Sequence, residues 1–444
     1  MSVSPYRITV RMYQVGFGDC FLLSFAYSKA LPDGRRERHL LIDFGSTRWP
    51  KDYLPRYRDL ASDIAIRTHG KLDVLVITHR HKDHIGGFAD DTAAATIAAL
   101  QPSLVLRPWT EDPKAAANAT GPALVGLRSL DYAAGLDTAQ AFAGEVAHTL
   151  SGRQQGFRGD LAAMAIEQLA NQDAIRHLDE LATRPGAKAG YLFAGRRSGI
   201  DDVIPGVATK VLGPPTIDQW PAVAGQRSDD PQYWLRQRGL LTHMLRTVDA
   251  PPAVIRVAAG ASSSPSGPRT IDPGPLRWIV ERMRDQQTHS LLRIVSSLED
   301  ALNNTSIILQ FRSGTRRLLF PGDAQIENWS YSLTSTSATA ATLRADLGTI
   351  DLYKVGHHGS RNASPRSLVT RWQSQTRPFV SMMSTLPDVH CETEATAVPR
   401  ATLVQALEGL GSLYRTDGLT PTQISTAVTA STRDTKAFAL AAPA

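Results

Sequence analysis

The amino-acid sequence predicts a layered α/β protein in which helical segments are inserted between blocks of β-strands. Short apolar runs typical of buried strands recur along the chain, and many of them end abruptly in polar residues. Ala-rich stretches with helical spacing separate these blocks. The 444 residues, of which 42% are hydrophobic, suffice for one large core. We therefore expect a single domain over residues 1–444, with helical insertions at about 115–185 and 216–300.

The N-terminal block is expected to consist of strands. Its runs either alternate or are continuously apolar, and turn signals such as "GFGD" and "LPDGRRER" separate them. The expected strands are "YRITVRMYQVG", "CFLLSFAY", "HLLIDFG", "LDVLVITH" and "PSLVLRPW".

The two insertions differ from the strand blocks in composition and in the spacing of their apolar residues. In the first, "LAAMAIEQLANQDAIRHLDELA" has helical spacing, with one apolar face made by Leu161, Met164, Ile166, Leu169, Ile175 and Leu178. The strand "GVATKVLGPP" follows, and its two prolines end it. The second insertion is irregular, with helices expected at "DDPQYWLRQRGLLTHMLRTV" and at 276–302 and a flexible loop at "GASSSPSGP".

The C-terminal block returns to strands, expected at "SIILQFR", "RRLLFPGD", "TIDLYKVGHHGS" and "RPFVSMMS". A helix, "RATLVQALEGLG", and the segment "SLYRTDG" come after them. Several strands of both blocks end in polar clusters, which contain Asp43, His79 to His84, Asp323, and His357 with His358. Because layered α/β proteins place function at the carboxyl ends of strands, we expect these clusters to meet at one rim.

Composition sets the class of protein and of partner. The start of the chain lacks the apolar core of a signal peptide and no window reaches the ~18 apolar residues of a membrane span, so we expect a soluble, cytoplasmic protein without a membrane partner. Cys20 and Cys391 are expected to be reduced thiols, with a single bridge as the alternative. The net charge of +6 mildly favours anionic partners such as nucleic acid.

The stretch "VLVITHRHKDHIGG", residues 74–87, indicates a metal site. His79 and His81 are two residues apart, so in extended backbone they point the same way and can share one metal. Asp83 and His84 follow as the chain turns into a helix, and they can hold a second metal. The alternative is a solvated loop in which Asp83 caps a helix. Three histidines within six residues, directly after a buried strand, speak against it.

This motif resembles the HxHxDH motif of metallo-β-lactamase-fold hydrolases, whose fold is an αββα sandwich with a dinuclear metal site. Further blocks occur in the order found in the soluble domain of ComEC-type DNA-uptake competence proteins, and the same layout recurs in teichoic-acid phosphorylcholine esterases. These blocks are "YQVGFGDCFLLSF", "HLLIDFGS", "VLGPP", "NNTSIILQF", "RRLLFPGDAQ", "LYKVGHHGSRNAS" and "GSLYRTDG".

The resemblance implies two divalent metal ions, Zn²⁺ or Mn²⁺, and a set of ligands for them. His79 and His81 would bind metal 1, and Asp83 and His84 would bind metal 2. Asp323 would bridge the two ions. His358 is preferred as the last ligand of metal 2, and His357 would then contact the substrate phosphate or act as an acid.

One position departs from the family pattern. Many of these enzymes supply a third histidine to metal 1 from the block that matches "VLGPP", where this chain has Gly213. Metal 1 is then completed by water, held loosely, or served by a histidine from elsewhere. The candidates, each of which is otherwise an ordinary surface or core histidine, are His148, His177, His243 and His289.

Other polar residues near the motifs are expected to support the ligands or the substrate. The resemblance implies that Asp43 orients the site through hydrogen bonds, and a similar role is expected for Asn304, Ser306 and Ser360. Lys354 and Arg361 either meet a phosphate or are solvated charges.

A dinuclear site of this kind activates water, so the reaction expected is metal-assisted hydrolysis, with Asp83 or a nearby histidine shuttling the proton. DNA is the favoured substrate, because the resemblance is to the competence proteins and because the second insertion interleaves aromatic residues with arginines. Those residues, which alternatively belong to amphipathic helices with solvated arginines, are Tyr233, Trp234, Arg236, Arg238, Arg277, Trp278, Arg282 and Arg284.

Two alternatives stay open. One is a small-molecule phosphodiesterase of the phosphorylcholine-esterase kind. The other is a non-enzymatic module with an incomplete metal site, whose helical insertions bind a protein partner or a second copy of the chain. β-Lactam hydrolysis is disfavoured, because the competence-type blocks match better.

Overall fold

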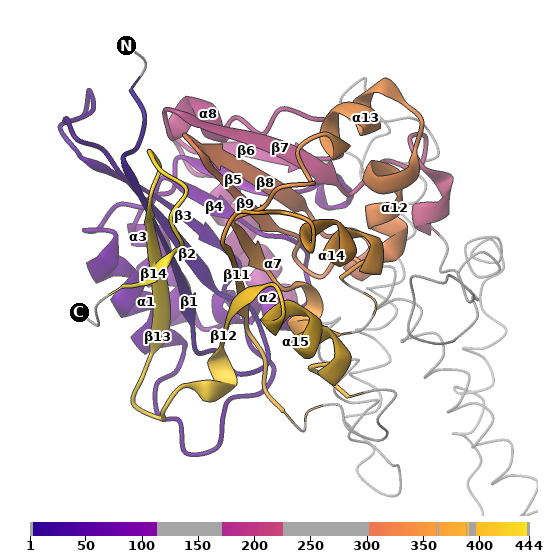
Figure 1. Cartoon of the computed structure of the whole chain (residues 1–444). Coiled ribbons are helices and arrows are strands. Elements are labelled where there is room, and N and C mark those ends of the chain that lie inside the picture. Colours follow the sequence, from indigo (N-terminus) through magenta and orange to yellow (C-terminus); the bar gives the residue numbers. More distant parts are fainter. Residues whose placement is uncertain are drawn as a thin grey trace, which may run out of the picture.

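Two mixed β-sheets and the helices that pack on them make up the computed structural model of the protein (Figure 1). The structure describes residues 3–112, 171–224, 302–360, 362, 364–387, 389 and 397–441. Within these ranges, no helix is long and apolar enough to cross a membrane.

The first sheet has eight strands, in the order β14-β13-β1-β2-β3-β4-β5-β6. Strands β13, β1, β2 and β3 pair antiparallel, and β3 to β6 pair parallel. The strands are β1 (Arg7–Tyr13), β2 (Phe21–Ala26), β3 (Glu37–Ile42), β4 (Val74–Val76), β5 (Leu104–Pro108), β6 (Lys188–Leu192), β13 (Ser425–Ser431) and β14 (Ala439–Leu440).

The second sheet has six strands, in the order β12-β11-β10-β9-β8-β7. Its strands β7, β8 and β9 pair antiparallel, and β9 to β12 pair parallel. The strands are β7 (Val207–Gly213), β8 (Ile308–Ser313), β9 (Arg316–Phe320), β10 (Leu352–Lys354), β11 (Phe379–Met383) and β12 (Gly411–Arg415).

Apolar side chains on both faces of each sheet explain why its central strands are continuously hydrophobic. Successive side chains of a strand point to opposite faces, so β3 places Leu40 and Ile42 in one apolar cluster and Leu41 in another. The cluster with Leu40 and Ile42 also contains Phe311 and Leu352 of the second sheet, so it lies between the two sheets.

The outer faces of the sheets are covered by helices. On the first sheet, Leu41 and its neighbours pack against α1 (Tyr57–Arg67), α3 (Asp91–Ala99) and α7 (Gln172–Thr183). On the second sheet, Leu319 and Tyr353 share a cluster with residues of α12 (Ile326–Thr334), α13 (Ala338–Arg344), α14 (Arg366–Trp372) and α15 (Ala401–Glu408). Figure 1 shows α12 to α15 on the side of the molecule opposite α1 and α3.

The strands expected from the sequence all form, and so does the helix at 401–408. Strands β6, β12, β13 and β14 and helices α1, α3, α12, α13 and α14 add to them, and β12 covers the start of the segment "SLYRTDG". Of the first insertion, the structure describes only the end: α7, in which Ile175 and Leu178 pack against the core as expected. The residues of that face from Leu161 to Leu169 lie outside the described residues, and so do Cys391 and most of the second insertion, including its aromatic and arginine residues.

The polar ends of the strands meet at one rim, as the sequence predicts. Asp43 follows β3, the histidine motif follows β4, Asp323 follows β9 and His358 follows β10. Asp19 precedes β2, which runs antiparallel to β3, so it lies at the same rim. Side-chain contacts join residues from both sheets there, for example His84 with Asp323.

Candidate metal centre

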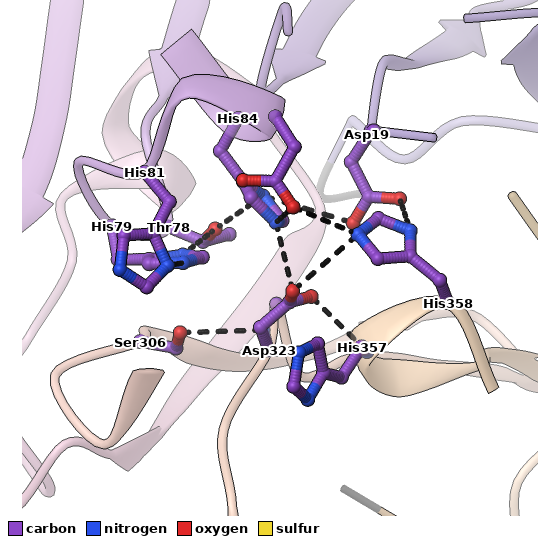
Figure 2. A network of polar contacts seen from close by, with 12 residues as sticks. Asp19, Thr78, His79, His81, His84, Ser306, Asp323, His357 and His358 are labelled. Carbon is purple, nitrogen blue, oxygen red and sulfur yellow. Dashed lines mark hydrogen bonds and ion pairs between the residues drawn. The ribbon is translucent and has the colours of Figure 1, made fainter. Parts of the chain in front are cut away.

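Four buried side chains form a compact group of potential metal ligands: Asp83, His84, Asp323 and His358. One ligand atom from each lies within 4.8 Å of the others. His84 Nε2 is 3.0 Å from Asp323 Oδ2, and His358 Nε2 is 3.0 Å from Asp83 Oδ2 and 3.6 Å from Asp323 Oδ2. Figure 2 shows His84, Asp323 and His358 converging on one another. The first sheet supplies two of the four residues and the second sheet the other two.

The local sequence brings the end of the ligand loop into close contact with the segment that follows β3. His81 is the extended residue at which α2 (Lys82–Ile85) begins, so Asp83 and His84 are carried on the first turn of a helix. Gly87 follows, and a Cβ added there would lie 2.4 Å from a ring carbon of Phe44. Only glycine allows this approach.

Three residues of this rim adopt left-handed backbone conformations although they are not glycine. Asp43 has φ 57°, and the consecutive residues His357 and His358 have φ 44° and φ 54°. Such conformations cost roughly 1–2 kcal/mol per residue, so the surrounding contacts must hold them in place. Strain concentrated at one polar cluster favours a functional role for it.

Hydrogen bonds fix the two histidine rings of the group. His84 Nδ1 lies 2.8 Å from Asp43 Oδ2, and His358 Nδ1 lies 3.1 Å from the carbonyl oxygen of Ser384. Because a carboxylate and a carbonyl only accept, both Nδ1 atoms carry a proton, and each ring turns its Nε2 toward the centre of the group. A metal-binding histidine is typically oriented in this way.

The donor set fits a divalent ion such as Zn²⁺ or Mn²⁺. His84 Nε2, Asp83 Oδ1 and Asp323 Oδ2 are buried without any hydrogen bond, although His84 Nε2 and Asp323 Oδ2 are only 3.0 Å apart. They are therefore close but not aligned with one another. Ligands held at ~2.0–2.2 Å from a zinc ion in a tetrahedral site are roughly 3.3–3.6 Å apart. The facing ligand atoms here are separated by 3.0 Å to 3.8 Å.

The charges of the group are strongly coupled. Burial alone would lower the pKa of His84, but Asp323, Asp43 and Asp83 together raise it well above its ordinary value. Burial alone would raise the pKa of Asp323, but His84 and Lys354 hold it well below its ordinary value. The surrounding carboxylates therefore favour a positive charge at His84 Nε2, which either a bound proton or a bound metal ion can provide.

His79 and His81 lie beside this group as a pair. His79 Nε2 is 2.9 Å from His81 Nδ1, and the rings of His79 and His84 are 4.1 Å apart. Burial lowers the pKa of both, for His81 to about 4, so both are neutral at neutral pH and can offer a lone pair. Neither belongs to a group of three or more donors among the described residues. The group of Asp83, His84, Asp323 and His358 therefore offers more metal ligands than the pair of His79 and His81.

The structure explains why position 213 carries no ligand. A Cβ at Gly213 would lie 2.0 Å from Asn328 Oδ1. Asn328 cannot swing away freely, because its Nδ2 donates to the carbonyl oxygens of Asn304 and Ser306. A histidine at 213 therefore does not fit this arrangement. His177, one candidate replacement, binds the carbonyl of Phe88 instead, and His148, His243 and His289 lie outside the described residues.

The residues expected to support the ligands divide into two groups. Asp43 accepts from both the backbone N–H and the hydroxyl of Thr78 besides binding His84, and the Ser306 hydroxyl accepts from the backbone N–H of Asp323. The side chains of Asn304 and Ser360 donate to Glu327 and Asn362, and their support of the ligands stays a prediction.

Of the residues expected to meet the substrate, the structure describes Lys354 and His357. Lys354 is not a solvated charge, because its side chain is only 2% exposed and is ion-paired with Asp19 and Asp323. Arg361 lies outside the described residues. The His357 side chain stays out of the four-ligand group, but its backbone N–H donates to Asp323 Oδ1.

Asp19 is a site residue to which the motifs do not point. It lies in "GFGDC", which reads as a turn, and only the antiparallel pairing of β2 with β3 brings it to the rim. Its Oδ2 is 3.8 Å from His84 Nδ1, and it forms a second, three-membered donor group with Asp43 and His84. An aspartate directly before a strand that is antiparallel to ligand-bearing strands is the signal that would have identified it.

Comparison with known proteins does not identify the chain. No protein-family model matches it, and no curated protein matches it in sequence. The resemblance to metallo-β-lactamase-fold hydrolases therefore stays a prediction that rests on the motifs.

Proposed function

We propose that the protein is a metal-dependent hydrolase of the metallo-β-lactamase type, that its two sheets and helix layers are the αββα sandwich of that fold, and that it cleaves phosphodiesters in DNA. The observation that carries the proposal is the convergence of Asp83, His84, Asp323 and His358 from two sheets, with their ligand atoms within 4.8 Å. The same four positions match the family's motifs.

In this proposal His79 and His81 hold metal 1, Asp83, His84 and His358 hold metal 2, and Asp323 serves both. The bound ions would bring a water molecule to hydroxide near neutral pH and take up negative charge on the attacked phosphoryl group. The protein's own part is to place groups around that water. Asp83 Oδ1 is buried without a hydrogen bond, so it is free to accept the proton of the attacking water.

His357 marks the side from which a substrate approaches. The residue His357 is partly exposed, whereas His79, His81, His84 and His358 are buried. Its Nδ1 has no hydrogen-bond partner, and burial lowers its pKa, so it is neutral at neutral pH. We assign it a hydrogen bond to a phosphate oxygen, because a neutral imidazole can donate its N–H but has no additional proton for the leaving group.

DNA is proposed as substrate on two grounds: the net charge of +6 and the order of the sequence blocks, which resembles that of the competence proteins. The test is incubation with Mn²⁺ or Zn²⁺ and labelled single- and double-stranded DNA, with bis-p-nitrophenyl phosphate in parallel. We expect DNA cleavage that Asp323→Ala abolishes and that the surface variant Asp201→Ala keeps. Asp201 lies at the exposed start of α8 (Ile200–Val203), far in sequence from every ligand.

Other outcomes separate the alternatives. Turnover of the small phosphodiester without DNA cleavage would replace DNA by a small-molecule substrate. Less than one metal ion per chain, together with equal behaviour of the native protein and Asp323→Ala, would refute a hydrolase and favour the partner-binding module.

A further inference from the structure

A lysine ammonium lies within the metal centre, enclosed by oxygen atoms. Lys354 Nζ donates to the carbonyl oxygen of Gly322 at 3.0 Å and lies 3.4 Å from Asp323 Oδ1. It also forms a close ion pair with Asp19. The side chains of Lys354 and both aspartates are at most 2% exposed.

We propose that Lys354 is a built-in cation of this centre: its ammonium fills a third cation position and so holds Asp323 with only Oδ2 free for the metal ions. Two carboxylate oxygens and one backbone carbonyl are the ligand type that hard divalent cations such as Mg²⁺ and Mn²⁺ prefer. The chain places a fixed positive charge at a position whose chemistry would otherwise attract a metal ion.

The distribution of charge supports this assignment. Four buried aspartates, Asp19, Asp43, Asp83 and Asp323, surround the histidine rings. Asp19 and Asp43 lie on the Nδ1 side of His84, where the second donor group is found, whereas Asp323 and Asp83 lie on its Nε2 side. Without Lys354, the buried carboxylate of Asp19 would have only the more distant rings of His84 and His358, at 3.8 Å and 3.9 Å, to balance its charge. Burying a carboxylate with so little compensation is unfavourable.

The consequence for Asp323 follows from its two oxygens. Oδ1 receives the ammonium of Lys354 and the backbone N–H of His357, at 3.4 Å and 3.1 Å. Oδ2 faces His84 Nε2 and His358 Nε2, at 3.0 Å and 3.6 Å. Lys354 and the backbone of His357 therefore fix the carboxylate through Oδ1, and only Oδ2 faces the position of a metal ion. Lys354 is in this sense a positioning residue and not a substrate contact.

A simpler view is that Lys354 only neutralises Asp19. Two variants separate the two views. Lys354→Ala removes the ammonium and leaves space among the three oxygens. Asp19→Asn/Lys354→Ala removes the ammonium together with the carboxylate that would attract a replacement ion. Lys210→Ala, which removes a surface lysine paired with Asp346, is the matched control.

The measurement is the number of Mn²⁺ ions per chain, by elemental analysis of protein equilibrated with Mn²⁺ and by paramagnetic resonance titration. We expect Lys354→Ala to bind one ion more than the native protein, and the double variant and Lys210→Ala to bind the native number. If Lys354→Ala is unfolded without metal, a Mn²⁺-dependent gain in stability that exceeds the gain of the native protein and of the double variant also supports the proposal.

A Lys354→Ala protein that takes up no additional ion and gains no Mn²⁺-dependent stability beyond that of the native protein, folded or not, overturns it. So does an additional ion that persists in the double variant. The inference rests on the metal centre proposed above, and ion binding by the native protein tells the two failures apart. If the native protein binds no ion, the proposed metal centre is refuted. If the native protein binds ions but Lys354→Ala binds no additional ion, only the proposed role of Lys354 is refuted.

Discussion

The hydrogen bond between His84 Nδ1 and Asp43 Oδ2 determines which nitrogen of that ring faces the other ligands. Asp43 is itself held by the backbone N–H and the hydroxyl of Thr78, both at 2.7 Å. The hydrogen bonds from Thr78 to Asp43 and from His84 to Asp43 therefore fix the imidazole ring of His84 before an ion binds. Preorganised ligands lose less conformational entropy on binding, so the affinity of the site depends on residues that never touch the metal.

Replacing Asp43 by alanine tests this dependence. His84 Nδ1 loses its acceptor and the ring loses its fixed orientation, so we expect metal binding to weaken about 10–100-fold. Calorimetric titration of the metal-free protein with Mn²⁺ measures the change. Asp201→Ala, on the exposed face of α8, should leave the affinity unchanged. An Asp43→Ala protein that is folded and binds Mn²⁺ as tightly as the native protein would contradict the role of this hydrogen bond.

A second buried histidine, far from the metal centre, links stability to pH. His39 in β3 is 2% exposed and lies 2.9 Å from the hydroxyl of Ser24 through Nδ1. Burial, followed by the charges of His69 and Arg35, lowers its pKa from 6.5 to about 3. The unfolded chain therefore takes up a proton near pH 6.5, whereas the folded chain does so only near pH 3.

His39 thus contributes stability that is complete above pH 6.5 and decreases as the pH falls from about 6.5 to 3. At pH 5 the expected loss from this residue is about 2 kcal/mol. Urea unfolding of the native protein and of His39→Gln at pH 7.5 and pH 5 measures it, because other groups titrate equally in both. Equal losses of unfolding free energy in the two proteins would show that His39 is not the group responsible.

At the scale of elements, the end of β7 is constrained by α12. Gly213 ends the strand, and Asn328 of α12 occupies the space where a side chain at 213 would stand. Asn328 also donates to two carbonyls of the segment 304–306, which carries Ser306 and through it contacts Asp323. One helix residue therefore connects the end of β7 at Gly213 to the position of Asp323.

Gly213→Ala should destabilise the protein by about 1–3 kcal/mol, because the new methyl group overlaps an anchored amide. Asn328→Ala should cost about 1–3 kcal/mol as well, since it leaves two buried carbonyls without a donor. In the double variant the overlap no longer exists, so its cost should be smaller than the sum of the two. Gly348→Ala is the control, because its added Cβ has nothing nearer than 3.8 Å. Additive costs in chemical denaturation would speak against the overlap.

The sequence predicted the elements that have a clear local pattern of apolar residues. It did not predict elements that form only because they pair with another part of the chain. Strands β3 and β4 are apolar on both faces and were readable as buried strands, and the histidine motif after β4 was readable as a ligand loop. Strand β13, "STAVTAS", is short and rich in Ser, Thr and Ala, and it becomes a strand because it pairs with β1 over the full length from Arg7↔Ser431 to Tyr13↔Ser425. Asp19 and Lys354 belong to the site for the same reason: their role comes from contacts between residues far apart in the chain.

At the scale of the whole molecule, the candidate centre joins the two sheets. Asp83 and His84 belong to the loop after β4 of the first sheet, whereas Asp323 and His358 follow β9 and β10 of the second. Apolar contacts also connect the sheets, but at this rim the contact is made by buried charged groups. A bound ion would therefore act as a link between the N-terminal and C-terminal halves of the fold.

If an ion links the two sheets, it should stabilise the folded protein in addition to its role in the proposed reaction. An ion present at 1,000 times its dissociation constant should raise the unfolding free energy by about 4 kcal/mol, because the unfolded chain does not assemble the site. Thermal unfolding with Mn²⁺ and with a chelator should then differ by several degrees.

Histidine-to-alanine variants on the two sides of the link give the decisive comparison. His84→Ala removes a ligand of the first sheet and His358→Ala removes one of the second, and either should abolish most of the metal-dependent shift. His69→Ala changes an exposed histidine in the turn that follows α1 and should keep the whole shift. If the ion were bound by one sheet alone, only one of the two ligand variants would lose the shift, because the other histidine would not contribute to binding. Loss in both, with the shift retained in His69→Ala, is the result expected of an ion that binds the two halves of the molecule to each other.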